Sequence, residues 1–167
     1  MDTQTAYYRY WDKSKDDSWH CLPYHCLDVG AVGLALLEKH DPIREQLIKL
    51  TGLSRRDFMQ WAVFLLVLHD VGKFSVTFPN VRPDLLSNLQ GRKTQKIGGH
   101  DGRHDTSGFA LWKNLLAKLL QNRGLLTLGS QRHTTAQSRA IDYWMAAMTG
   151  HHGSPPRGRT SGDEQLI

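Results

Sequence analysis

The sequence is poor in cysteine and lacks long apolar stretches, and both shortages narrow the class of protein. Only two cysteines, Cys21 and Cys26, occur in 167 residues, so a disulfide framework is not expected. The chain shows no signal-peptide pattern, and we therefore expect a cytoplasmic protein. The longest apolar run, residues 61–68 (WAVFLLVL), is far shorter than the roughly 20 residues that cross a bilayer, so no membrane partner is predicted.

Strand patterns, repeats and low-complexity tracts are also missing. Apolar residues follow a helical period instead, which predicts an all-α fold, the helical bundle of a single domain. Residues 1–22 are expected to be irregular, and residues 74–102, interrupted by proline and glycine, are expected to form a long loop. The predicted helices cover residues 24–39, 42–50, 54–69, 105–122 and 136–149.

Acidic residues are scarce in the second half of the chain. Residues 91–167 carry 11 Lys or Arg against 5 Asp or Glu, whereas residues 1–90 carry 10 against 11. The net charge of +5 therefore comes from the second half. This asymmetry is compatible with a polyanionic partner such as nucleic acid, although basic proteins without such a partner are common.

Histidine is concentrated at the ends of the predicted helices. The apolar run that ends at Leu68 is followed directly by His69 and Asp70. A stripe of Val29, Val32 and Leu36, predicted to face inward, leads back in helical steps to His25. Similar stripes in the later helices lead to His104 and to the pair His151 and His152. We therefore expect these side chains to converge on one interior point.

Imidazole and carboxylate are the ligands that divalent manganese, iron, cobalt, nickel and zinc accept in proteins. A shared carboxylate such as Asp70 can bridge two ions, and two ions about 3.5–4 Å apart can activate water for attack on a phosphoryl group. A single inward histidine is more often a hydrogen-bonded core residue, but five of them beside one aspartate favour a metal site. A zinc site built on Cys21 and Cys26 is disfavoured, because no second cysteine cluster exists.

The segment His69-Asp70-Val71-Gly72-Lys73-Phe74 resembles the signature of the HD superfamily of metal-dependent phosphohydrolases. Three further segments resemble one branch of it, the HD nuclease domain that begins the type I CRISPR interference nuclease-helicase. These segments are Tyr10-Trp11-Asp12-Lys13-Ser14, Tyr24-His25-Cys26-Leu27-Asp28-Val29 and Thr149-Gly150-His151-His152-Gly153. The resemblance covers roughly residues 7–153.

The resemblance implies a role for each of these side chains. Asp70 would bridge two metal ions, His25 and His69 would hold the first ion, and the second ion would be held by His104, His151 and His152. Lys73 would act beside Asp70 by neutralising the scissile phosphate or the charge that develops on it. A solvated lysine at a helix C-terminus is the competing interpretation of Lys73. The implied cofactors are one or two divalent ions per chain, with manganese, iron, cobalt, nickel or magnesium as candidates.

The implied activity is metal-dependent cleavage of single-stranded DNA in antiviral defence, with a guide-RNA surveillance complex and a helicase domain or subunit as partners. Two alternatives are a phosphohydrolase acting on nucleotides and a non-catalytic remnant that binds metal. The family closes its first metal position with a downstream aspartate, and Asp163 has no helical context for that role. We therefore expect residues 1–153 to form a partial HD domain and residues 154–167 a flexible tail.

Overall fold

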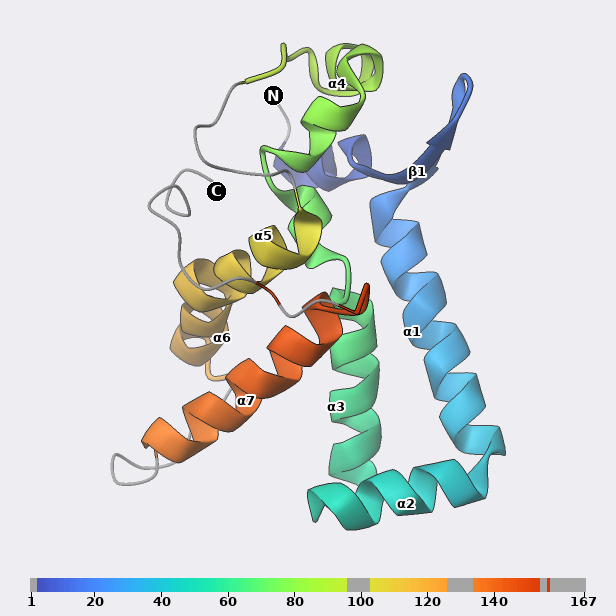
Figure 1. Ribbon diagram of the computed structural model, residues 1–167, viewed down its shortest axis with the longest axis vertical. Coiled ribbons are helices and arrows are strands. Elements are labelled where there is room, and N and C mark those ends of the chain that lie inside the picture. The colour runs from blue at the N-terminus through green and yellow to red at the C-terminus, as the bar shows by residue number, and fades with distance from the viewer. Residues whose placement is uncertain (1–2, 96–102, 126–133, 154–155, 157–167) are drawn as a thin grey trace.

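The structure is a computed structural model that describes residues 3–95, 103–125 and 134–153 together with Pro156. It is mostly helical, with a small hairpin near the N-terminus (Figure 1). The α-helices are α1 (Leu22–Lys39), α2 (Asp41–Thr51), α3 (Arg55–Leu68), α4 (Pro83–Gln90), α5 (His104–Leu111), α6 (Ala117–Asn122) and α7 (Thr134–Thr149). The 3-10 helices η1 (Thr3–Arg9), η2 (Val71–Phe74) and η3 (Phe78–Val81) are shorter, and a π-helical segment, η4 (Trp112–Leu116), joins α5 to α6.

All five predicted helices are present, and their ends follow capping chemistry. The hydroxyl of Ser54 accepts a hydrogen bond from the Asp57 amide at 3.1 Å, which satisfies one free N–H group at the start of α3. Gly52 adopts a left-handed conformation (φ 67°) that ends α2. The fourth predicted helix corresponds to the continuous run α5–η4–α6.

The prediction that no strands occur was wrong. Strands β1 (Trp11–Lys15) and β2 (Ser18–Cys21) form an antiparallel hairpin. Lysine, serine and aspartate dominate β1 and seldom favour strands, so no apolar alternation marks it. The hairpin forms because Asp16 takes a positive φ (51°) in the turn and because the Arg82 guanidinium donates to the Ser14 hydroxyl at 2.8 Å.

The predicted long loop over residues 74–102 was also wrong in part, because it contains η3 and α4. Helix α4 begins at Pro83, the position that tolerates proline best, and is ended by Gly91 in a left-handed conformation (φ 65°). Leu85 and Leu86 of α4 bury their side chains against Trp11 of β1. This second apolar cluster attaches the hairpin to the body of the protein.

The main core is centred on α3, α7 and the α5–η4–α6 run. Its buried members are Leu65, Trp112 and Met145, and partly buried side chains such as Trp61 and Ile141 pack around them. The indole N–H of Trp112 is satisfied by the Asp142 carboxylate at 3.1 Å. The core thus fixes the C-terminal ends of α3 and α7, and both of these ends lead into histidines.

The predicted inward stripe of α1 was wrong, because Val32 and Leu36 are exposed. The face of α1 that meets α3 carries Gly30 and Gly33 instead. A Cβ atom at Gly33 would lie 2.2 Å from Cδ1 of Leu66, so a larger residue there would require the Leu66 side chain to move. Hydrophobic periodicity misses such a face because glycine adds nothing to an apolar count.

No helix in the described part of the chain is both long enough and apolar enough to cross a membrane. The predicted tail, residues 154–167, falls outside the described residues except for Pro156.

Candidate metal centre

Six predicted site residues come from segments far apart in the sequence, and the structure brings them together. Figure 1 shows the C-terminal ends of α3 and α7 meeting near the middle of the molecule, with α1 alongside. The contributing side chains lie at or just beyond helix ends: His25 in α1, His69 and Asp70 after α3, His104 at the start of α5, and His151 and His152 after α7.

The first group consists of His25, His69 and Asp70. The two imidazole Nε2 atoms are 3.1 Å apart, and Oδ2 of Asp70 lies 3.2 Å from Nε2 of His25 and 3.3 Å from Nε2 of His69. Three donor atoms therefore surround one point.

The second group consists of His104, His151 and His152. The Nε2 atoms of His104 and His152 are 3.0 Å apart. The other carboxylate oxygen of Asp70, Oδ1, lies 3.3 Å from Nε2 of His104 and 3.6 Å from Nε2 of His151. Asp70 thus directs one oxygen to each group.

Backbone carbonyls hold two of the imidazoles in a defined tautomer. Nδ1 of His69 lies 2.7 Å from the Leu66 carbonyl, and Nδ1 of His151 lies 3.0 Å from the Met148 carbonyl. A carbonyl only accepts, so each Nδ1 carries the proton and each neutral ring presents a free lone pair at Nε2. Metal-binding histidines are held in the same way in known metalloproteins.

The approach of η2 to α5 depends on Gly72. A Cβ atom at this position would lie 1.8 Å from the carbonyl oxygen of His104 and 2.4 Å from the Gly108 amide nitrogen. Both neighbours are backbone atoms that cannot rotate away. The absence of a side chain at Gly72 therefore lets His104 come within reach of Asp70.

Lys73 is buried rather than solvated, which argues against the competing interpretation of this residue. Its ammonium group contacts Oδ2 of Asp70 at 2.6 Å and also Oδ1 of Asp12. Burial alone would raise the pKa of Asp70, but His104, His69 and the Lys73 charge together lower this pKa well below its usual range. Asp70 is therefore a stable carboxylate anion.

The imidazoles respond to the same environment. Burial lowers the pKa of His25 and of His151, against the attraction of the Asp70 charge. Neutral imidazole is the form that binds metal. Burial would also lower the pKa of His69, but contact with Asp70 outweighs it and raises this pKa. A raised pKa means that the Asp70 carboxylate stabilises positive charge on the His69 ring beside it.

These donor atoms fit divalent cations. Oδ1 of Asp70 is buried without a hydrogen-bond partner, which is costly unless a cation compensates it. Nitrogen ligands bound at about 2.1 Å to one octahedral ion lie about 3 Å apart, close to the Nε2 separations within each group. That these residues bind metal stays a prediction, and one that the geometry permits.

Asp12, for which no role was predicted from the sequence, has a side chain that is almost fully buried beside Lys73 and His25. Its signal was present, because Asp12 belongs to one of the segments that resemble the family. His20 also lies near, and Asp12, His20 and His25 form a third group of potential ligands. His20 is exposed and lies 3.8 Å from the carboxylate of Asp28, so it is the least constrained of the three.

Comparison with known proteins identifies the family. Residues 11–166 match the family described as "Cas3, HD domain". The chain belongs to the Cas3 HD-domain family. The resemblance seen in the sequence is thereby confirmed. The comparison with solved structures found no significant match.

Two curated relatives belong to the same group, and both are named "CRISPR-associated endonuclease/helicase Cas3". The protein from Escherichia coli strain K12 is 35% identical over 157 residues, which cover 86% of this chain and 17% of that protein. The protein from Thermus thermophilus is 30% identical over 159 residues, which cover 93% of this chain and 15% of that protein. The chain therefore spans about a sixth of the length of these relatives.

Proposed function

We propose that the chain is a metal-dependent nuclease that hydrolyses phosphodiester bonds in CRISPR defence. The observation that carries the proposal is that Asp70 directs one oxygen to each of two ligand groups. Bound divalent ions would supply an activated water and would neutralise phosphate charge. Membership of a family whose curated relatives are named as endonucleases supports the same conclusion.

The protein's own residues would divide the work as follows. His25, His69 and Asp70 would hold the first ion, and His104, His151 and His152 the second. Asp70 would fix the positions of the two ligand groups relative to each other. The Lys73 ammonium, held between two carboxylates, would fix the orientation of Asp70 and keep the site close to neutral before substrate arrives.

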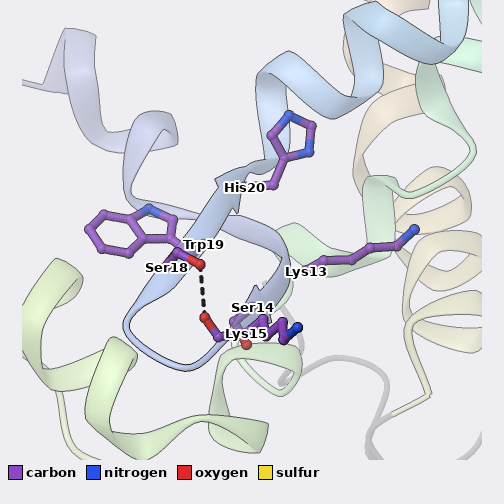
Figure 2. A pocket seen from close by; sticks show the side chains of 6 residues that line it. All are labelled: Lys13, Ser14, Lys15, Ser18, Trp19 and His20. Atoms are coloured by element: carbon purple, nitrogen blue, oxygen red, sulfur yellow. Dashed lines mark hydrogen bonds between the residues drawn. The ribbon is translucent and has the colours of Figure 1, made fainter.

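The substrate we propose is single-stranded DNA, and the hairpin beside the centre supports it. Figure 2 shows the pocket lined by the hairpin, with the indole of Trp19 and the side chain of Lys13 pointing to opposite sides of the hairpin. Trp19, Lys13 and Lys15 are exposed, and neither lysine has an ion-pair partner among the described residues. An exposed ring that can stack on bases, on the same hairpin as two exposed ammonium groups that can contact phosphates, suits a flexible single strand.

The remaining partners and the location are proposals of the same kind. We propose that a helicase domain or subunit delivers the strand, after a guide-RNA surveillance complex has opened the target, and that this occurs in the cytoplasm. The relatives' names, which join endonuclease and helicase, support the helicase.

Replacing Asp70 by alanine tests the catalytic proposal. The variant should lose metal-stimulated cleavage of a circular single-stranded DNA, because both ligand groups lose their shared oxygen donor. Glu38→Ala, which removes an exposed carboxylate near the C-terminal end of α1, is the control and should keep its activity. Full activity in Asp70→Ala rejects the assignment. Phosphate release from free nucleotides without DNA cleavage identifies a nucleotide phosphohydrolase instead.

Substitutions in the hairpin test the substrate proposal. Trp19→Ala should weaken binding of a labelled single strand by about 1–3 kcal/mol. Lys13→Ala with Lys15→Ala should reduce the slope of log affinity against log salt concentration by the amount expected for about two phosphate contacts. The control is Lys39→Ala with Lys49→Ala, which removes the same charge from exposed positions, at the end of α1 and in α2. Equal effects in the two double variants contradict a specific role for the hairpin.

A further inference from the structure

Asp12 is a buried carboxylate whose position the ligand groups do not explain. Its side chain is only 1% exposed. Oδ1 contacts the Lys73 ammonium, whereas Oδ2 is buried and has no hydrogen-bond partner. Oδ2 lies 3.2 Å from Nδ1 of His25, a separation at which N–H···O hydrogen bonds form once the ring is aligned.

His25 needs such a partner because of its place in the fold. His69 and His151 follow helix C-termini, where unpaired carbonyls three residues back accept their Nδ1–H groups. His25 lies near the N-terminus of α1, where the helix has unpaired N–H groups instead of carbonyls. An acceptor for its Nδ1–H must therefore come from another element, and strand β1 places Asp12 there.

We propose that Asp12 is the positioning residue of His25. Its Oδ2 accepts the Nδ1–H of the imidazole, so that the ring stays in the tautomer whose Nε2 lone pair faces His69 and Asp70. Oδ1 is meanwhile held by Lys73, which also binds Asp70. One buried chain, His25–Asp12–Lys73–Asp70, thus links the hairpin to the carboxylate shared by the two ligand groups.

The geometry favours positioning over direct coordination by Asp12. Its free oxygen faces Nδ1 of His25, whereas the atoms of the first group surround Nε2 of the same ring. A carboxylate behind a metal-binding imidazole is a recurrent arrangement, and removing it typically weakens metal affinity about 10–100-fold.

Metal titration tests the role of Asp12 without reference to cleavage. Manganese binding is measured by calorimetry for the unaltered chain, Asp12→Asn, Asp12→Ala and the control Asp17→Asn, which changes an exposed aspartate of the same hairpin. We expect affinity to fall in the order unaltered, Asn, Ala, with a loss of about 10–100-fold for Asp12→Ala, because Asn keeps an acceptor oxygen. Asp17→Asn should bind as the unaltered chain does.

The tautomer of His25 gives a second measurement that a merely structural residue does not affect. In the metal-free chain, nitrogen-15 NMR should show the proton of the neutral ring on Nδ1, and Asp12→Ala should move part of the population to Nε2. An unchanged tautomer overturns the proposal, as does unchanged affinity in Asp12→Ala. Loss of the first ion in Asp12→Asn as complete as in His25→Ala also overturns it, because Asp12 is then a ligand.

This inference rests on the proposed metal centre but not on its reaction. A chain that binds manganese with the expected order of affinities and cleaves no DNA refutes the nuclease proposal and leaves the role of Asp12 intact. A chain that cleaves DNA but binds manganese equally well in Asp12→Ala supports the nuclease proposal and refutes the role of Asp12.

Discussion

At the scale of single residues, Lys73 determines how stable the fold is when the site holds no metal. Two carboxylates, Asp12 and Asp70, are buried within reach of one ammonium group. Two carboxylates that contact the same ammonium group and are taken out of water repel each other strongly unless a cation lies between them. Lys73 supplies that cation before any metal binds, so its first contribution is to stability.

Lys73→Met should therefore destabilise the metal-free chain by about 3–5 kcal/mol, the usual cost of removing one partner of a buried ion pair. Lys73→Arg should recover part of this loss, because it keeps the charge. The free energy of unfolding in urea, measured with chelator present, checks both values.

Lys113→Met provides the matched control. Lys113 pairs with Asp142, but its side chain is 49% exposed, so losing this pair should cost at most about 1 kcal/mol. Similar losses for Lys73→Met and Lys113→Met show that the buried triad contributes no more than a surface pair.

At the scale of elements, the contact between η2 and α5 makes Gly72 indispensable. Gly72→Ala forces a Cβ atom against the backbone of His104, so α5 has to move. We expect a loss of about 3 kcal/mol or more, at or above the upper end of the range for overpacked cores. Because His104 moves with α5, manganese affinity should fall as well. Urea unfolding and calorimetry measure the two effects.

Gly52→Ala is the control that distinguishes the steric clash expected at Gly72 from the strain of a positive φ. Gly52 has a positive φ, but a Cβ atom added there would meet nothing within 4 Å, so its replacement should cost only about 1–2 kcal/mol and leave metal binding unchanged. If Gly72→Ala behaves like Gly52→Ala, the packing of η2 on α5 is looser than the structure indicates.

The elements also show why some of the fold was predictable and some was not. Capping signals such as Ser54 and Gly52 are local, and the helices they bound were found. The hairpin was missed because long-range contacts of Trp11 and Arg82 stabilise it, not a local apolar pattern. The buried face of α1 was misjudged because two glycines, Gly30 and Gly33, form part of its contact with α3.

At the scale of the whole molecule, convergence of the histidines could be inferred, but their partners could not. Helical steps from apolar stripes indicated that His104 and His152 point inward; the two rings do meet, but His152 is exposed instead of interior. Which Asp70 oxygen faces which group, and which acceptor holds each Nδ1, depends on how helices far apart in sequence cross. Asp12 escaped notice for the same reason, since only the docked hairpin brings it to His25.

This convergence predicts how the whole chain responds to metal. Ions that bind the folded state alone stabilise it by about 2.7 kcal/mol when their concentration is 100 times the dissociation constant. For a chain of this size, each kcal/mol raises the melting temperature by roughly 2–4 °C, so manganese should raise it by roughly 5–10 °C. Scanning calorimetry of the untagged protein measures the shift, and a chelator should reverse it. Asp70→Asn should abolish most of the rise, because the two ligand groups lose the charge they share. A melting temperature indifferent to both manganese and chelator contradicts a metal centre at this point of the fold.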